Sequence, residues 1–130
     1  MKLITQKICM TRDLGVHGNL FGGNMLSWID EAAALQAAKI CRTPNMVTLK
    51  IEEVIFKRPV KMGDIINIYG SPSQIGVSSI TLKMEARKHD VVSGEETLVC
   101  STKIVFVRVD KDGNTKAIDT DIRNQFKIVK

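Results

Sequence analysis

One uninterrupted helical segment, residues 24–41, constrains the fold more than any other feature of the sequence. It contains no glycine or proline and consists mainly of good helix formers. Apolar residues recur along one side at helical spacing: Leu26, Ile29, Ala33, Ala37 and Ile40. The other side adds Met25, Trp28, Ala32 and Leu35. A helix that is apolar on nearly all sides is expected to be buried.

The rest of the chain favours strands. Strand-like stretches cover residues 2–11, 46–57, 65–75, 78–88 and 97–109, of which 78–88 alternates most regularly between apolar and polar residues. The later stretches are joined by short turns, which implies antiparallel neighbours. We therefore predict an α+β fold in which one curved antiparallel sheet wraps around the single long helix. We expect one domain over residues 1–130, and we predict no secondary structure for its tail, residues 114–130.

Composition and charge narrow the classes of function. The net charge of +5 favours anionic partners such as nucleotides, nucleic acid, acidic lipids or a phosphorylated cofactor. Aromatic residues make up only 5% and no nucleic-acid-binding motif is present, so we expect no nucleic-acid partner. No apolar run approaches a membrane span, and we expect neither a signal peptide nor membrane insertion.

The three cysteines, Cys9, Cys41 and Cys100, lie far apart and form no CxxC pair. A disulfide framework or a zinc site is therefore not expected. Reduced thiols in a cytoplasmic protein are the simpler interpretation. Cys41 as a nucleophile has little support, because no histidine or acid is near it in the sequence.

Asp30 is the anomalous residue of the helix. On a helical projection it falls inside the stripe formed by Leu26, Ala33 and Ala37, whereas Glu31 points elsewhere and is easily solvated. A carboxylate on the apolar side of a buried helix is destabilising unless it is paired. Either Asp30 sits at the margin and reaches water or an amide, or it is a positioned base or nucleophile in a cleft.

A glycine-rich loop leads into the helix and carries Gly15, Gly18, Gly22 and Gly23. Unpaired N–H groups at a helix start can stabilise an oxyanion, and the glycines would let a ligand approach them. Ordinary loop geometry is the alternative interpretation. Asp30 lies about 10 Å further along the helix, so the carboxylate used with a given helix start could come from a neighbouring subunit.

Several other polar residues are candidates. Asn19 and His17 lie in the glycine-rich loop, where an amide can hold a water or carbonyl and a histidine can act as a base, although both are also common structural residues. His89 lies in a polar turn and suggests no role. The basic pair Lys57-Arg58 and the small segment 76–79 lie at strand ends, where they would contact a phosphorylated ligand or simply be solvated.

The stretch from His17 to Ala32, HGNLFGGNMLSWIDEA, resembles the start of the hotdog-fold acyl-CoA thioesterases, closest to the YciA-like acyl-CoA thioester hydrolases. The likeness continues through the segments FKRPV (56–60), MGD (62–64) and GVSSI (76–80) and covers about residues 10–115. It implies a hotdog fold and the hydrolysis of acyl-CoA to free CoA and a carboxylic acid, with broad acyl specificity.

The resemblance also implies roles for individual residues. Asp30 would be the catalytic carboxylate, Asn19 its partner and Gly23 an oxyanion N–H. The residues that would flank CoA are Lys57, Arg58, Pro59, Gly76, Val77, Ser78 and Ser79. Asp30 and Asn19 would come from different subunits of a homodimer whose sheets join side by side, and a trimer of dimers would be the usual assembly.

The sequence departs from other hotdog branches in two places. Phe21 stands where some thioesterases have a histidine before the glycine pair, and the His-Phe-Pro-Gly type motif of hotdog dehydratases is absent. We therefore expect a thioesterase that needs no metal or cofactor, since no ligand cluster is visible. The alternative is a non-catalytic acyl-CoA binding or sensing protein, because fold alone does not fix function.

Overall fold

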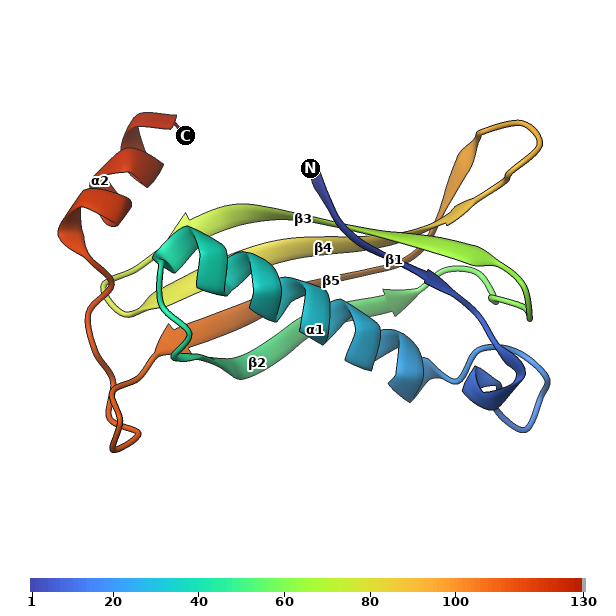
Figure 1. Ribbon diagram of the computed structural model, residues 1–130, viewed down its shortest axis with the longest axis horizontal. Helices are drawn as coiled ribbons and strands as arrows, with labels where there is room; N and C mark the ends of the chain where they lie inside the picture. The colour runs from blue at the N-terminus through green and yellow to red at the C-terminus, as the bar shows by residue number, and fades with distance from the viewer. Residues whose placement is uncertain (130) are drawn as a thin grey trace.

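A computed structural model describes residues 1–129, and side chains as far as residue 126. A short strand β1 (Lys2–Ile8) and a 3-10 turn (Thr11–Asp13) precede the long helix α1 (Gly22–Cys41). Four strands follow: β2 (Met46–Phe56), β3 (Ile65–Ile75), β4 (Ser79–His89) and β5 (Glu96–Arg108). A final helix, α2 (Thr120–Val129), closes the chain. The sheet and the long helix form the predicted α+β arrangement (Figure 1).

The sheet has the strand order β1-β3-β4-β5-β2, and every neighbouring pair is antiparallel. Helix α1 lies across one face of this sheet (Figure 1). The side chains that meet between the two layers are mainly aliphatic, and fully buried examples include Ile29, Ile68, Leu82 and Ile104; Trp28 and Phe106 are also buried in this core. The regular alternation of 78–88 therefore reflects one face on the core and one face away from it.

Helix α1 begins at Gly22, two residues earlier than predicted. The N–H groups of the first helical residues make no hydrogen bond within the helix, so glycines are tolerated there. The prediction of burial on nearly all sides was wrong, because Ser27, Glu31, Leu35 and Lys39 form an exposed stripe. The sheet covers only one face of the helix, and this stripe lies on the other.

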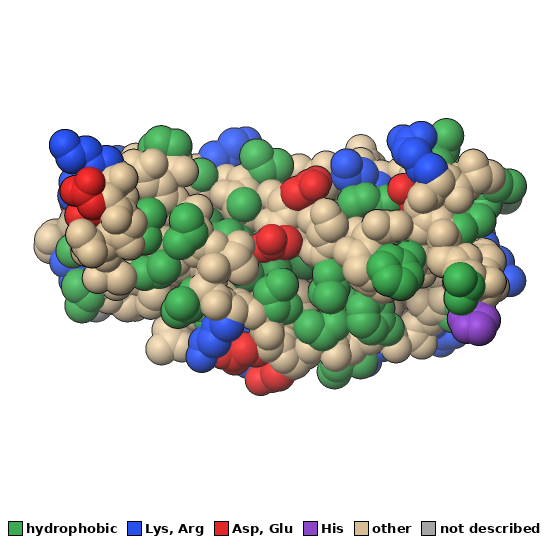
Figure 2. Space-filling view, turned by 90° about the horizontal axis from the view of Figure 1, so that it is seen from below, with side chains coloured by type: hydrophobic (Ala, Val, Ile, Leu, Met, Phe, Trp, Pro, Cys, Tyr) green, Lys and Arg blue, Asp and Glu red, His purple; other side chains and the backbone are tan. Residues whose placement is uncertain are grey.

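The two edges of the sheet differ in character. Strand β1 is short, whereas β2 is long and carries exposed apolar side chains: Val47, Leu49, Ile51, Ile55 and Phe56. Figure 2 views the molecule from the side on which β2 and α1 lie in Figure 1, and hydrophobic side chains gather there. An unpaired, apolar edge strand is a template for pairing with another chain.

The tail that the sequence left unassigned is structured up to the last described residue. Ile118 and Ile122 are buried, and the N–H of Ile118 donates to the carbonyl of Val77 at 2.8 Å. The guanidinium of Arg108 pairs with Asp119 at 3.2 Å. These contacts hold α2 beside the β3–β4 turn; Lys130 lies outside the described residues. No helix of the described part of the chain is both long and apolar enough to cross a membrane.

Gly70 lies in the middle of β3, where a side chain would have no room. A Cβ at this position would overlap Oε1 of Gln36 and lie 2.8 Å from Sδ of Met84. We expect Gly70→Ala to lower the free energy of unfolding by about 1–3 kcal/mol, because buried overpacking forces side chains or backbone to shift. Urea unfolding measures this loss, and Ser71→Ala at the neighbouring half-buried position is the control. Equal stability of both variants would contradict the packing described here.

Candidate active site

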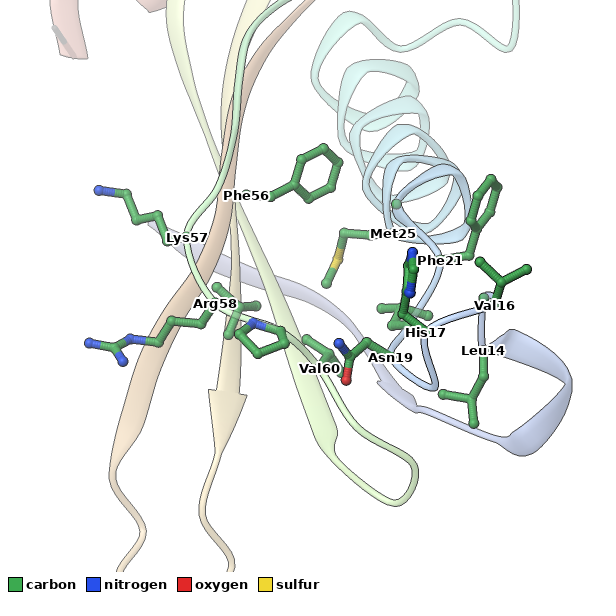
Figure 3. A pocket seen from close by; sticks show the side chains of 15 residues that line it. Leu14, Val16, His17, Asn19, Phe21, Met25, Phe56, Lys57, Arg58 and Val60 are labelled. Atoms are coloured by element: carbon green, nitrogen blue, oxygen red, sulfur yellow. The ribbon is translucent and has the colours of Figure 1, made fainter.

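The main cavity lies where the glycine-rich loop, the start of α1 and the end of β2 converge (Figure 3), and its volume is about 870 Å³. Its lining is largely apolar, with Asn19, His17 and the Lys57-Arg58 pair as its polar members. The apolar lining residues include Leu14, Val16, Leu20, Phe21, Met25, Phe56, Pro59, Val60 and Val99. A cavity of this size and character suits a ligand with a long apolar part and a charged end.

Backbone and side-chain hydrogen bonds hold the glycine-rich loop in place. The carbonyl of Asp13 accepts from the N–H of Phe21 at 3.0 Å and from Nδ2 of Asn24 at 2.9 Å. The N–H of Leu20 donates to the carbonyl of Val60 at 2.7 Å. The loop is therefore fixed both to the first turn of α1 and to the segment after β2, which gives the cavity a defined wall.

Two backbone N–H groups at the start of α1 have no hydrogen-bond acceptor among the described residues. The N–H groups of Asn24 and Met25 both donate to the carbonyl of Phe21, at 3.0 and 3.1 Å. Those of Gly22 and Gly23 remain unpaired at the positive end of the helix dipole. Gly22 lines the cavity, whereas Gly23 is exposed beside it. The pair can donate to an oxygen that gains negative charge.

Aromatic rings flank both glycines. A Cβ at Gly22 would lie 3.3 Å from Cζ of Phe56, and one at Gly23 would lie 2.8 Å from Cε2 of Phe21. A side chain at Gly23 would therefore push the ring of Phe21 away. Glycine at these positions lets the backbone and the rings lie close together; the approach of a ligand to the same amides stays a prediction.

Asn19 and His17 both project into the cavity (Figure 3). Asn19 is half-buried and His17 is exposed. The amide of Asn19 makes no hydrogen bond with any described residue, although its backbone carbonyl accepts from the N–H of Gly15 at 2.8 Å. Asn19 thus presents a free donor and a free acceptor to whatever occupies the cavity.

Asp30 does not line this cavity. It is half-buried, and its Oδ1 accepts a hydrogen bond at 2.9 Å from Oγ1 of Thr48, near the start of β2. The eight residues from Gly22 to Asp30 span about 12 Å of helix. Thr48 was missed by the sequence analysis, because only the packing of α1 on β2 brings a strand hydroxyl to this carboxylate. Asp30 therefore lies at the margin of the helix's buried face, as one of the two interpretations had it, and its protein partner is a hydroxyl.

The residues expected to flank CoA separate into two groups. Lys57, Arg58 and Pro59 line the main cavity, and both basic side chains point away from α1 (Figure 3). Gly76 and Ser79 instead line a polar hollow of about 310 Å³, together with Lys50 and Lys103. The turn residues Val77 and Ser78 interact through their backbone: the carbonyl of Val77 accepts from the N–H of Ile118 and that of Ser78 from the N–H of Arg108, at 2.8 and 2.7 Å.

These two groups lie at opposite ends of the sheet. Phe56 pairs with Cys100 at one end of β5, whereas Met46 and the 76–79 turn adjoin Arg108 at the other. The eight residue steps from Cys100 to Arg108 span about 26 Å of strand. A single chain therefore does not bring all the candidate residues to one place.

A polar cluster away from the cavity escaped the sequence analysis. Glu96 accepts hydrogen bonds from Tyr69 at 2.6 Å and from Asn67 at 2.8 Å, and the guanidinium of Arg87 lies 4.0 Å from the centre of the Tyr69 ring. The hydrogen bonds from Tyr69 and Asn67 lower the pKa of Glu96, and the hydrogen bond to Glu96 raises the pKa of Tyr69. Because the partners come from three strands, only the sheet register reveals the cluster. His89 ends β4 nearby and lines no cavity described here.

The cysteines are buried, and burial raises the pKa of both Cys41 and Cys100 to about 11. Burial also raises the pKa of Cys9. A raised pKa favours the neutral thiol, so very little thiolate exists at pH 8. We expect an aromatic disulfide reagent to leave all three thiols unmodified in the native protein at pH 8 and to label three in denaturant. Rapid labelling of the native protein would reopen a nucleophilic role for Cys41.

No group of three or more His, Cys, Asp or Glu side chains within the described part of the chain is arranged to hold a metal ion. The chemistry available at the cavity therefore comes from amides, basic side chains and a carboxylate at some distance along α1.

Comparison with known proteins places this geometry in a family. The profile of the thioesterase superfamily matches residues 17–95. An uncharacterized acyl-CoA thioester hydrolase of Haemophilus influenzae is 32% identical over 119 residues, which cover 89% of this chain and 77% of that protein. The acyl-CoA thioester hydrolase YciA of Escherichia coli is 28% identical over 122 residues, or 92% of each chain.

Solved structures of similar proteins have the same fold as this chain. A hexameric hotdog-fold thioesterase of Campylobacter jejuni is 31% identical, with a TM-score of 0.84 and 96% of each chain covered. An aspartate-to-alanine mutant of a hexameric broad-specificity acyl-coenzyme A thioesterase is 27% identical, with a TM-score of 0.88 and 98% of this chain and 96% of that chain covered.

The acyl-CoA hydrolase of Staphylococcus aureus, solved with butyryl coenzyme A and coenzyme A, is 27% identical with a TM-score of 0.83 over 96% of this chain and 79% of that chain. Mutants of that enzyme replace an asparagine and, fifteen residues later, an aspartate by alanine. The hotdog fold and the thioesterase resemblance predicted from the sequence are confirmed, and the chain belongs to the thioesterase superfamily.

Proposed function

We propose that this protein hydrolyses acyl-CoA thioesters to free CoA and a carboxylic acid. The observation that carries the proposal is a pair of unpaired N–H groups, on Gly22 and Gly23, beside a largely apolar cavity that has the outward-pointing basic pair Lys57-Arg58 at its rim. That combination suits a thioester carbonyl joined to an apolar acyl group and a phosphorylated carrier. The relatives described above bear the names of acyl-CoA hydrolases.

In the proposed reaction, the thioester carbonyl oxygen binds at the Gly23 N–H, with Gly22 beside it. Asp30 removes a proton from water as the hydroxide attacks the carbonyl carbon, and the oxyanion is stabilised by these N–H donors. The tetrahedral intermediate then breaks its C–S bond, and the CoA sulfur takes the proton from the carboxyl group. The alternative is direct attack by Asp30 to give an anhydride that water then cleaves. Neither route uses a metal or cofactor.

Asn19 is proposed to orient the water or the acyl group through its free amide. The residue fifteen positions before Asp30, at the spacing of the mutated pair in the S. aureus enzyme, is Gly15. Asn19 therefore approaches the site from a later point of the loop, and its role rests on its position in the cavity.

The active unit is proposed to be a homodimer formed along β2. Within one chain, Asp30 is held beside Thr48 near one end of β2 and the free amides lie beside Phe56 at the other end, about 12 Å away along α1. Antiparallel pairing of two β2 edges about a two-fold axis reverses one strand relative to the other. It thus moves the Thr48 end of one chain towards the Phe56 end of its partner and covers the apolar edge.

The same reversal brings the two CoA-flanking groups closer together across the dimer. The Lys57-Arg58 end of one chain then faces the 76–79 end of its partner, and the basic side chains suit the CoA phosphates. Several relatives are hexamers, and a trimer of such dimers is the proposed assembly. We further propose a cytoplasmic location, which the three reduced thiols favour.

The test is CoA release from a panel of acyl-CoAs, from acetyl to palmitoyl. We expect hydrolysis of several chain lengths, and the panel gives the preference. Saturable binding of CoA without release from any thioester would instead support the alternative, a non-catalytic acyl-CoA binding or sensing protein. Neither binding nor release would overturn both proposals.

A further inference from the structure

A second hollow lies far from the candidate active site, between β1, the C-terminal half of α1 and β3. Its volume is about 590 Å³. Gln36 in its floor lies fourteen residues along α1 from Gly22, which corresponds to about 21 Å of helix. None of the residues that line this hollow lines the main cavity. We call it the β1–α1 hollow.

The β1–α1 hollow is lined by apolar side chains and by positive, but not negative, charges. Its walls carry Leu3 and Leu35, which are 43% and 52% exposed, together with the half-buried Ile40. Its charged side chains are Lys2 and Lys39, and no acidic residue lines it. Neither ammonium group forms an ion pair with any described residue. Exposed leucines next to two free cations suit a ligand with an apolar body and an anionic end.

The floor of the hollow is shaped by Gln36 and the glycine opposite it. Gln36 is only 7% exposed, and its Nε2 donates to the carbonyl of Gly70 at 3.1 Å. Its Oε1 is buried without a hydrogen-bond donor. A side chain at residue 70 would overlap this oxygen, so the glycine leaves the space that the amide occupies. The Gln36 amide therefore shapes the floor of the hollow but faces Gly70, so the chemistry offered to a ligand comes from the lysines and leucines of the walls.

We propose that the β1–α1 hollow binds an aliphatic carboxylate of medium chain length. The carboxylate lies between Lys2 and Lys39, and the hydrocarbon chain covers Leu3, Leu35 and Ile40. A free phosphate would leave the leucines uncovered, and an alkylamine would be repelled by both lysines. The binding does not require the hydrolase activity proposed above, although that reaction would release a product of this class.

The test is a calorimetric titration of the full chain with decanoate, in the presence of a saturating non-hydrolysable thioether analogue of decanoyl-CoA, which occupies both the acyl part and the CoA part of the main cavity. We expect one decanoate per chain, and no binding of decylamine. Lys39→Glu reverses the charge at an exposed helix position and should weaken decanoate binding by about tenfold or more. The matched control is Lys111→Glu, which makes the same change in an exposed turn and should leave binding unaltered.

Two outcomes would overturn the proposal. Equal weakening by Lys39→Glu and Lys111→Glu would show non-specific attraction to a basic protein. No binding to wild type would show that the hollow is closed, for example by a second copy of the chain. The titration involves no thioester, so failure of the proposed hydrolase activity leaves its result interpretable.

Discussion

Asp30→Asn is expected to reduce kcat for acyl-CoA hydrolysis about 10²- to 10⁴-fold, because the variant keeps the shape of the side chain but removes the base. The amide can still accept the hydrogen bond from Thr48, so the fold and the affinity for CoA should change little. Steady-state release of CoA measures the loss in kcat, and calorimetric titration with CoA measures the affinity.

The control for this prediction is Thr48→Val, which removes the hydroxyl that holds Asp30 but leaves the carboxylate. Loss of one such hydrogen bond is worth about 1 kcal/mol, so kcat should fall only about tenfold or less. Near-normal turnover by Asp30→Asn would remove Asp30 from the mechanism. A larger loss in Thr48→Val than in Asp30→Asn would show that the contact matters for structure rather than for chemistry.

The architecture was largely predictable, because the spacing of apolar residues along the sequence follows which side of each helix or strand is buried. The alternation of Ile80, Leu82, Met84 and Ala86 predicted β4, and the structure buries all four. Two parts of the fold were predicted wrongly or not at all, and each has a physical reason. The exposed Leu35 could not be told from core residues by spacing, since the sheet covers only one face of α1. Helix α2 escaped prediction because the residues that lead into it, Ile118 and Asp119, are placed by contacts with the distant Val77 and Arg108.

The candidate site was harder to predict from the sequence, because residues that are far apart in the chain come together only in the folded structure. The sequence singled out Asn19, Gly23 and the Lys57-Arg58 pair; Asn19 and the basic pair line one cavity, whereas Gly23 lies beside it and Gly22 lines it instead. It could not show that the 76–79 segment lies at the other end of the sheet, because that depends on strand register. The distance argument for a carboxylate from a second chain needed only the rise of a helix, and the two-subunit site stays a prediction.

The two-subunit site predicts that two inactive variants restore each other. Asp30→Asn removes the carboxylate, and Gly23→Val displaces the Phe21 ring beside the free N–H groups. Each variant alone should lose most of its activity. In a hybrid dimer one site carries both changes and the other carries neither, because the interface has two-fold symmetry. Co-expression in equal amounts makes about half of the dimers hybrid, so we expect about a quarter of wild-type activity.

The control for this experiment is co-expression of Asp30→Asn with Asp30→Ala, which leaves every site without its carboxylate and should restore nothing. Recovery with Gly23→Val but not with Asp30→Ala would require Asp30 and the glycine amides to come from different chains. Failure of both mixtures, in samples where hybrid dimers are present, would instead place the two groups in one subunit. The distance along α1 would then have to be bridged by the substrate, because about 12 Å separates Gly22 from Asp30 in the chain itself.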